Sequence, residues 1–253
     1  MATIEEKLAK SLTAETTELI PYLPYLLQDL WDLGSSPRDI VHLMSKHMKV
    51  TRDIKVLDLA CGKGAVSVYI AREMGCSVKG IDLMPDFIAD ASQKSRQHGV
   101  ESLCEFAVGD ITEAVLTEKG YDVVILGAVG DVLGSPEETI IKLKNTIKPK
   151  GYLIIDDAYG QKGASIDYLT RAEWLDIFEK TGVGLLEDLI VDEDELKGIN
   201  DEQQGHIAKR AAELKHQYPE SAWLFDSYLQ SQQAEVNQLE NEISGVTMIL
   251  KDM

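Results

Sequence analysis

The spacing of hydrophobic residues changes twice along the chain. Between residues 55 and 181, short apolar runs alternate with stretches in which apolar residues recur every three or four positions. The runs predict strands and the periodic stretches predict amphipathic helices. The predicted strands cover 55–60, 76–81, 103–108, 122–126 and 152–156, and the predicted helices cover 64–74, 85–98, 112–119, 136–147 and 171–181. Such alternation is typical of an α/β protein whose parallel sheet is covered by helices on both faces.

The first 48 residues have helical spacing and no strand pattern. Pro21 and Pro24 interrupt the first helical stretch, and a second helix is expected through residues 26–31. Ser36 and Pro37 predict the start of a third helix, because serine is a common N-cap and proline suits the first helical position.

The C-terminal part also departs from the alternation. Residues 184–191 and 245–250 predict two further strands. Between them, residues 193–242 are acidic and helical, and Pro219 divides the stretch. The predicted organisation is an N-terminal helical region (1–48), a core formed by 49–192 with 243–253, and a helical insertion (193–242).

The charge of the chain limits the partners that we expect. Its 253 residues include 25 Lys and Arg against 43 Asp and Glu, which gives a formal net charge of −18. This argues against nucleic acid, because proteins bind nucleic acid largely by neutralising phosphates with Lys and Arg. A high net charge also favours solubility. A cationic substrate, attracted to an acidic site entrance, stays possible.

The sequence lacks the signals of a membrane or secreted protein. No apolar run reaches the roughly 18 residues of a membrane span. The N-terminus has no continuous apolar run of the kind found in secretory signals. The three cysteines are an odd number without metal-ligand spacing, so we expect reduced thiols and a cytoplasmic protein.

A glycine-rich turn follows the first predicted strand. The segment from Asp58 to Gly64, with the sequence DLACGKG, runs from the strand into the next helix. Glycine lets the backbone turn sharply and approach a ligand closely. The helix N-terminus behind the turn offers unpaired N–H groups. This pattern alone predicts a binding turn without specifying the ligand.

Three acids stand near the carboxyl ends of consecutive predicted strands. Asp58 lies within the first strand, where burial is unfavourable unless N–H groups or a cationic ligand satisfy the carboxylate. Asp82 ends the second strand, at a spacing from Gly64 where an acid can accept hydrogen bonds from a ribose diol. Asp110 follows the third strand, where a carboxylate can receive an exocyclic amine. Together these acids are hard to explain as surface charge.

These motifs resemble those of the class I S-adenosylmethionine-dependent methyltransferases. The turn from Asp58 to Gly64 is similar to their first motif, Asp82 to the ribose-binding acid of their second, and Gly109-Asp110 to the adenine-side acid of their third. Residues 121–126, 147–153 and 170–175 resemble their later motifs, and the context of Asp82, DLMPDFI, resembles the ubiquinone-biosynthesis-type branch.

The resemblance covers about residues 35–191 and the last strand. It implies an α/β, Rossmann-like, seven-stranded doubly wound sheet with an antiparallel last strand. It implies S-adenosylmethionine as cofactor, S-adenosylhomocysteine as product and no metal. It also implies a lid over the cofactor in residues 1–48 and a substrate cover in 193–242. The implied cofactor-binding residues are Asp58, Ala60, Cys61, Gly62, Gly64, Asp82, Leu83, Gly109, Asp110, Ile111 and Gly127.

The expected reaction is methyl transfer to a small molecule by in-line displacement. A hydroxyl acceptor needs a general base, whereas a neutral amine or a thiolate does not always need one. Asp131 after the fourth strand, and Asp156, Asp157 and Tyr159 after the fifth, are substrate-side candidates, and no pattern singles out one of them as catalytic. A homodimer stays open.

Two other functions stay open. An NAD-dependent oxidoreductase also has a glycine-rich turn and a distal acid, but its third glycine falls at Ser67. A non-catalytic protein that binds S-adenosylmethionine would have the same motifs. Asp156-Asp157 is similar to the acidic pair of metal-dependent catechol-type methyltransferases, but an acid at the end of the fourth strand is missing.

Overall fold

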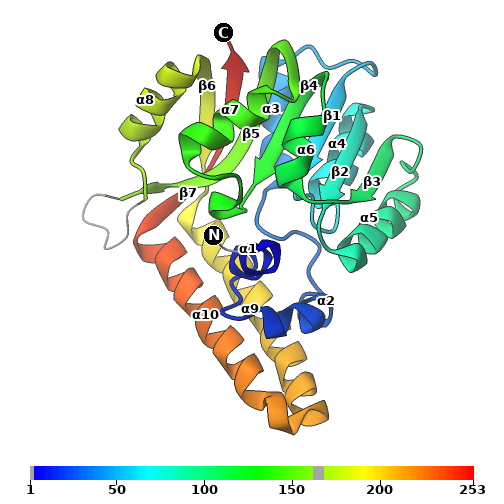
Figure 1. Ribbon diagram of the computed structural model, residues 1–253, viewed down its shortest axis with the longest axis vertical. Coiled ribbons are helices and arrows are strands. Elements are labelled where there is room, and N and C mark those ends of the chain that lie inside the picture. The colour runs from blue at the N-terminus through cyan, green and yellow to red at the C-terminus, as the bar shows by residue number, and fades with distance from the viewer. Residues whose placement is uncertain (1–2, 162–167) are drawn as a thin grey trace. The chain divides into compact units, whose positions relative to one another are not determined.

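The computed structural model describes residues 3–161 and 168–253 and contains one seven-stranded sheet (Figure 1). The strands are β1 (Lys55–Leu59), β2 (Ser77–Asp82), β3 (Cys104–Val108), β4 (Tyr121–Gly127), β5 (Ile147–Gly160), β6 (Val183–Ile190) and β7 (Ile243–Asp252). Their order is β3-β2-β1-β4-β5-β7-β6, with β1 to β5 parallel and β6 antiparallel to β7. The predicted doubly wound sheet with an antiparallel last strand is confirmed.

Six helices pack with the sheet. They are α3 (Pro37–His47), α4 (Ala65–Met74), α5 (Pro85–Gln97), α6 (Ile111–Thr117), α7 (Pro136–Lys144) and α8 (Arg171–Thr181). α3, α4 and α5 contact one another in a row, and so do α6, α7 and α8. The apolar faces of α6, α7 and α8 form one buried cluster with sheet residues such as Leu57, Val124 and Leu153. This burial supplies most of the driving force for the layer arrangement.

The helix starts follow local signals in the sequence. The side chain of Ser36 accepts the N–H of Asp39, as the Ser36-Pro37 pair predicts for the start of α3. Thr170 and Glu173 form a reciprocal capping box at the start of α8. Such a cap stabilises a helix by about 1 kcal/mol.

The start of the fifth strand needs correction. The predicted helix over 136–147 and the predicted strand over 152–156 leave a connection between them, but β5 already begins at Ile147, which pairs with Tyr121. Lys150 has φ 65°, and the register shifts between Tyr121 and Val123. The bend is therefore an irregularity within β5. The sequence Lys-Pro-Lys-Gly at residues 148–151 suits both a bent strand and a loop, so the sequence does not show which of the two is formed.

The chain folds as two compact units. The sheet unit comprises residues 32–159, 169–190 and 246–253, and the helical unit comprises the described residues of 1–31, 160–168 and 191–245. The N-terminal boundary thus falls at residue 31 and not at 48. The reason is that α3 contacts α4 and β6 in the sheet unit, whereas residues before it pack with α9 and α10.

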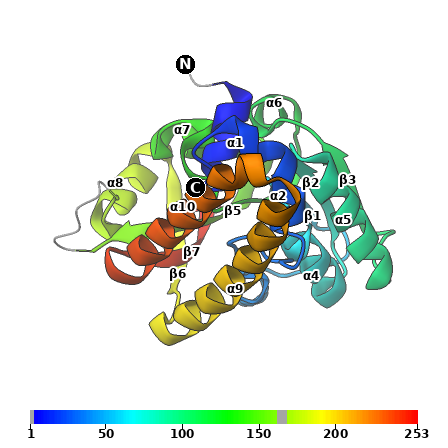
Figure 2. The ribbon, with the colours of Figure 1, turned by 90° about the horizontal axis from the view of Figure 1, so that it is seen from below.

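The helical unit is built around two long antiparallel helices. Its elements are α1 (Ile4–Ser11), η1 (Thr17–Tyr22), α2 (Leu23–Leu26), α9 (Glu193–Gln217), η3 (Pro219–Ser221) and α10 (Ala222–Asn241). α9 and α10 lie side by side, and α2 contacts α9 (Figure 2). The expected helix through residues 26–31 is instead the short α2, which has Pro24 in its first turn and ends before Leu27, where the backbone leaves the helical conformation. In the part of the chain that the structure describes, no helix has both the length and the apolar character that crossing a bilayer requires.

Candidate functional site

The loop after β1 turns sharply at the carboxyl edge of the sheet. Ala60, Gly62 and Gly64 all have positive φ, at 56°, 52° and 74°. A Cβ on Gly64 would lie 2.7 Å from the Cβ of Ala91, so this position requires glycine for conformation and for space. Ala60 adopts a left-handed conformation that costs about 1 kcal/mol or more in a residue with a side chain. The loop is thus held in a shape that other sequences would not easily take.

Asp82 supports this loop from the end of β2. Its Oδ2 accepts the N–H of Gly62 at 2.8 Å, and its Oδ1 accepts the N–H of Met84 at 2.9 Å. The residue is 7% exposed, and burial raises the pKa of its carboxyl group while the backbone N–H groups oppose that rise. Each carboxylate oxygen keeps a further acceptor site, so Asp82 can also receive hydroxyl groups of a ligand.

Asp58 is buried beneath the same loop. Its Oδ2 accepts the hydroxyl of Ser67 on α4 at 2.5 Å. Burial raises the pKa of Asp58 to about 7, the hydroxyl of Ser67 lowers it, and the charges of Asp82 and Asp156 raise it further. A cationic group bound nearby would favour the ionised carboxylate.

Asp110 has a structural role that its sequence position did not reveal. It is the N-cap of α6, and Thr112 donates to it with both its N–H (2.8 Å to Oδ1) and its hydroxyl (2.7 Å to Oδ2). The preceding Gly109 donates its N–H to the carbonyl of Asp82 at 2.9 Å. The side chain therefore stands at the strand edge next to β2, and its predicted contact with adenine stays a prediction.

The remaining cofactor-side candidates also lie at the ends of β1, β2, β3 and β4. Cys61 is buried and its N–H binds the carbonyl of Ile81, while Leu83 follows directly after β2. Ile111 is buried at the start of α6, and Gly127 is the last residue of β4. The carboxyl ends of parallel strands share one edge. Successive strands are added on one side of β1 up to β3 and on its other side from β4 onward, so the strand order reverses between β1 and β4. Ligands of doubly wound proteins bind at such a switch point.

Lys63 anchors the glycine loop to α5. It is 3% exposed, and its Nζ lies 3.6 Å from Oδ2 of Asp90 and 5.7 Å from the centre of the Phe87 ring. The sequence did not indicate that Lys63 contacts α5, because its partners Phe87 and Asp90 lie more than twenty residues further along the chain.

The substrate-side candidates Asp131, Asp157 and Tyr159 differ in their surroundings. Asp131 is exposed in a short 3-10 turn after β4. Asp157 is exposed, yet the surrounding protein raises its pKa by desolvation. Tyr159 is buried, its hydroxyl donates to Oδ2 of Asp188 at 3.0 Å, and Arg171 binds the same carboxylate at 2.6 Å. Burial, followed by the hydrogen bond to Asp188, raises the pKa of Tyr159, whereas Arg171 lowers it, and these contacts favour a role in packing.

Asp156, the neighbour of Asp157, occupies a more unusual position. It is the register partner of Gly127, and its Oδ1 accepts the hydroxyl of Thr247 on β7. Burial raises its pKa to about 6. Thr247 and Ser35, which lies against Gly127, are site residues that no sequence motif indicated. Among the described residues, no group of three or more His, Cys, Asp or Glu side chains has the arrangement of a metal site.

Comparison with known proteins agrees with this geometry. The sequence model of a family described as a methyltransferase domain matches residues 51–242. The chain belongs to this family. The resemblance to class I S-adenosylmethionine-dependent methyltransferases is thereby confirmed.

Individual relatives of this methyltransferase are distant. A ubiquinone biosynthesis O-methyltransferase of Rickettsia felis is 28% identical over 136 residues, 54% of each chain. A ribosomal protein L11 methyltransferase of Dictyoglomus thermophilum is 26% identical over 157 residues, 61% of this chain and 46% of its own. The chain thus matches about half the length of these curated relatives.

The fold extends over nearly the whole chain. The crystal structure of a methyltransferase from Geobacter sulfurreducens, in complex with S-adenosyl-L-homocysteine, has a TM-score of 0.78 and 20% identity, and covers 92% of this chain and 98% of its own. A methyltransferase from Thiobacillus denitrificans, in complex with the same compound, has a TM-score of 0.76 and 21% identity, with the same coverage.

Proposed function

We propose that this chain binds S-adenosylmethionine at the carboxyl edge of its sheet and transfers the methyl group to a small molecule. The observation that carries the proposal is the glycine turn from Ala60 to Gly64, which Asp82 holds through the N–H of Gly62. Because Gly62 and Gly64 have no side chains, the backbone of this turn can approach a ligand closely beside a carboxylate, as a nucleoside with a ribose diol requires.

The residues at this edge fit the proposed cofactor. Asp82 would bind the ribose hydroxyls, and Asp110 and Ile111 would face the adenine. Asp58 would compensate the positive charge of the methionine part. When bound, S-adenosylmethionine supplies an activated methyl group, so the protein mainly has to orient the acceptor and exclude water.

The structure weakens the alternative of an NAD-dependent oxidoreductase. The position of the third glycine in a dinucleotide motif is Ser67, and its hydroxyl is the hydrogen-bond donor to the buried Asp58. Glycine at this position serves close packing of helix and strand, whereas here the side chain has a specific partner.

A small-molecule acceptor agrees with the charge of the chain, since a net charge of −18 disfavours nucleic acid. Relatives include a ubiquinone biosynthesis O-methyltransferase and a glycine/sarcosine/dimethylglycine N-methyltransferase, although a ribosomal protein L11 methyltransferase is also among them. Incubation with methyl-labelled S-adenosylmethionine and a metabolite extract tests this point. We expect the label in small molecules, and label only in protein would contradict the proposal.

We further propose that the helical unit is the substrate cover, and that the enzyme acts in the cytoplasm. A hairpin between β6 and β7 needs only a short loop, so the long excursion through α9 and α10 is not required by the sheet. Because residues 3–31 pack with these helices, the test removes both segments together.

A variant that lacks residues 1–31 and has a short Gly-Ser turn in place of 193–242 should bind S-adenosylhomocysteine within a few-fold of the full chain. It should lose turnover of the metabolite found above. Loss of cofactor binding in a variant whose circular dichroism shows a folded sheet unit would contradict the assignment of the cover.

A further inference from the structure

A carboxyl oxygen at the end of β5 lacks a partner. Asp156 Oδ1 accepts the hydroxyl of Thr247, whereas Oδ2 is inaccessible to solvent and has no hydrogen-bond partner among the described residues. The hydroxyl of Ser35 lies near this carboxyl group and lowers its pKa, but it does not meet the geometry of a hydrogen bond to Oδ2. Buried polar atoms are nearly always satisfied, so an orphaned carboxylate oxygen points to a ligand.

This oxygen lies at the edge of the sheet that carries the proposed site. Asp156 and Gly127 are register partners, and Oδ2 lies 3.3 Å from the position that a Cβ on Gly127 would occupy. Asp58 pairs with Ile125, two residues before Gly127, and side chains alternate along a strand. Asp156 and Asp58 therefore lie on the same face of the sheet, both at its carboxyl edge.

The surroundings of Asp156 are negatively charged. The strongest charged neighbours are Asp39 on α3 and Asp157 on β5, and both make ionisation of Asp156 harder. Asp156 in turn acts on Asp58, as Asp82 does. Both oxygens of Asp82 bind N–H groups and Oδ2 of Asp58 binds Ser67, whereas Oδ2 of Asp156 is the buried carboxylate oxygen without a hydrogen-bond partner among the described residues.

We infer that Oδ2 of Asp156 receives an N–H of an ammonium group, and that the methyl acceptor of this enzyme is therefore an amine. The inference rests on the proposed function and names its substrate class. A cation compensates the clustered carboxylates, whereas an oxygen or sulfur acceptor would have to develop negative charge beside Asp156 and Asp157, which disfavours it.

The same oxygen can take the proton that the acceptor must lose. The N–H bond of the ammonium breaks, its electron pair stays on nitrogen as the nucleophile, and an O–H bond forms on Asp156. The proton then passes to solvent when the carboxyl group ionises again. A pKa of about 6 makes Asp156 a stronger proton acceptor than an ordinary aspartate, yet leaves it ionised at neutral pH.

The test uses binding and not turnover. The full chain is saturated with S-adenosylhomocysteine, and two pairs of probes of equal shape are titrated by calorimetry: benzylamine with benzyl alcohol, and propylamine with propanol. The amide resonance of Gly127 in NMR spectra locates the bound probe. We expect each amine to bind at least about tenfold more tightly than its alcohol, as one charge-assisted hydrogen bond implies.

Three variants locate the preference. Asp156→Asn keeps the shape and an acceptor for Thr247, and should lose the preference for the amine while binding S-adenosylhomocysteine as before. Asp157→Asn should reduce the preference for the amine less than Asp156→Asn does. Asp176→Asn removes the same charge from an exposed position on α8 and should retain the preference in full.

Several results would overturn the inference: equal binding of amine and alcohol, no binding of either amine, no response at Gly127, or a preference that survives in Asp156→Asn. If Asp156→Asn does not fold, the inference is still tested by the binding of amine and alcohol to the wild type and by the response of the Gly127 resonance. Failure of the proposed function would appear separately, as methyl label in protein and not in small molecules.

Discussion

At the scale of single residues, the site combines buried acids with very different partners. Asp82 is bound by two backbone N–H groups, Asp58 by one hydroxyl, and Asp156 has one oxygen without a partner. Burial raises the pKa of all three. Acids with a raised pKa are typical of functional sites, because ligands or reacting groups supply the missing compensation.

Replacing Asp82 should affect both the ligand and the fold. Asp82→Ala removes the acceptor for the ribose hydroxyls, each charge-assisted hydrogen bond contributing about 1.5–3 kcal/mol. Affinity for S-adenosylhomocysteine should fall at least about tenfold, measured by calorimetry. The melting temperature of the ligand-free protein should also fall, because the N–H groups of Gly62 and Met84 lose their acceptor. Unchanged affinity would exclude Asp82 from the ligand site.

The pH dependence of stability should report on Asp58. Its pKa in the folded protein, about 7, lies above the ordinary 3.8, so the folded state binds a proton that the unfolded state has released between these values. The free energy of unfolding should therefore decrease as pH rises toward 7.

Asp156, with a pKa of about 6, should also make the free energy of unfolding decrease as pH rises, in the lower part of this pH range. Asp58→Asn should flatten the profile between about pH 6 and 7, as followed by urea denaturation at a series of pH values. Ser67→Ala should shift the decrease to higher pH, since the hydroxyl of Ser67 lowers the pKa of Asp58. A profile unaffected by Asp58→Asn would contradict this assignment.

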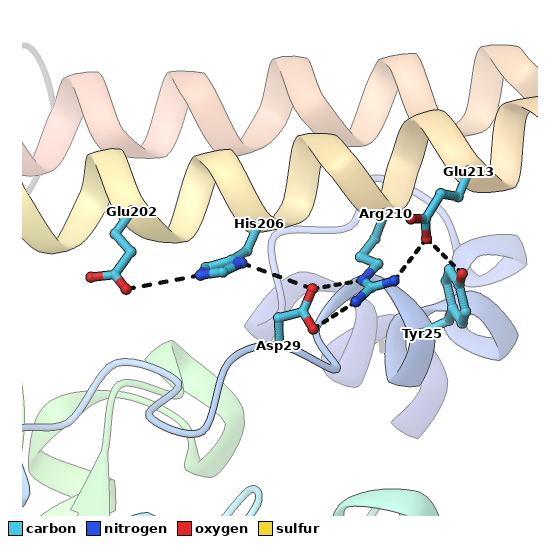
Figure 3. A network of polar contacts seen from close by, with 6 residues as sticks. All are labelled: Tyr25, Asp29, Glu202, His206, Arg210 and Glu213. Carbon is cyan, nitrogen blue, oxygen red and sulfur yellow. Dashed lines mark hydrogen bonds and ion pairs between the residues drawn. The ribbon is translucent and has the colours of Figure 1, made fainter.

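At the scale of elements, the helical unit joins segments that lie far apart in the sequence (Figure 3). Arg210 on α9 forms two hydrogen bonds with Asp29, at 2.6 and 2.7 Å, and one with Glu213 at 2.9 Å. Tyr25 donates to Glu213 at 2.6 Å, and His206 lies 3.8 Å from Asp29. The residues after α2 are thereby fixed to α9 by a bidentate pair that lysine cannot reproduce.

Replacing Arg210 should loosen the N-terminal segment. In Arg210→Lys, hydrogen exchange measured by mass spectrometry should become faster in residues 23–31 and remain unchanged in the sheet unit. The matched control is Lys215→Ala, which removes a single contact of 2.7 Å with Asp226 between α9 and α10. This control should leave residues 23–31 unchanged. Equal exchange in Arg210→Lys and wild type would show that the apolar packing of Tyr22 against Phe225 suffices.

The sequence predicted the elements of the sheet unit well because each depends on local signals. Strand 122–126 and helix 171–181 were expected within one or two residues of the β4 and α8 that are observed. The glycine turn and Asp82 were identified because their spacing is fixed by one strand-turn-helix unit. The partners Ser67, Thr247 and Ser35 were not identified, because they depend on which strands and helices become neighbours in space.

At the scale of the whole molecule, the two units differ in how far sequence reasoning applies. The sheet unit follows a repeated strand-helix pattern, so its topology could be inferred from order and from the resemblance. The grouping of residues 1–31 with 191–245 could not, because no periodicity links segments about two hundred positions apart. The boundary moved from 48 to 31 for the same reason, since Ser36 and Pro37 mark the start of a helix but not the unit to which it belongs.

The claim that this edge of the sheet holds S-adenosylmethionine is tested most directly by calorimetric titration of the purified chain. S-adenosylmethionine, S-adenosylhomocysteine and NAD are titrated in turn into the wild type and into Asp82→Ala. We expect micromolar binding of both sulfur nucleosides to the wild type, much weaker binding to the variant, and no heat with NAD. Micromolar binding of NAD together with no response to either sulfur nucleoside would contradict it.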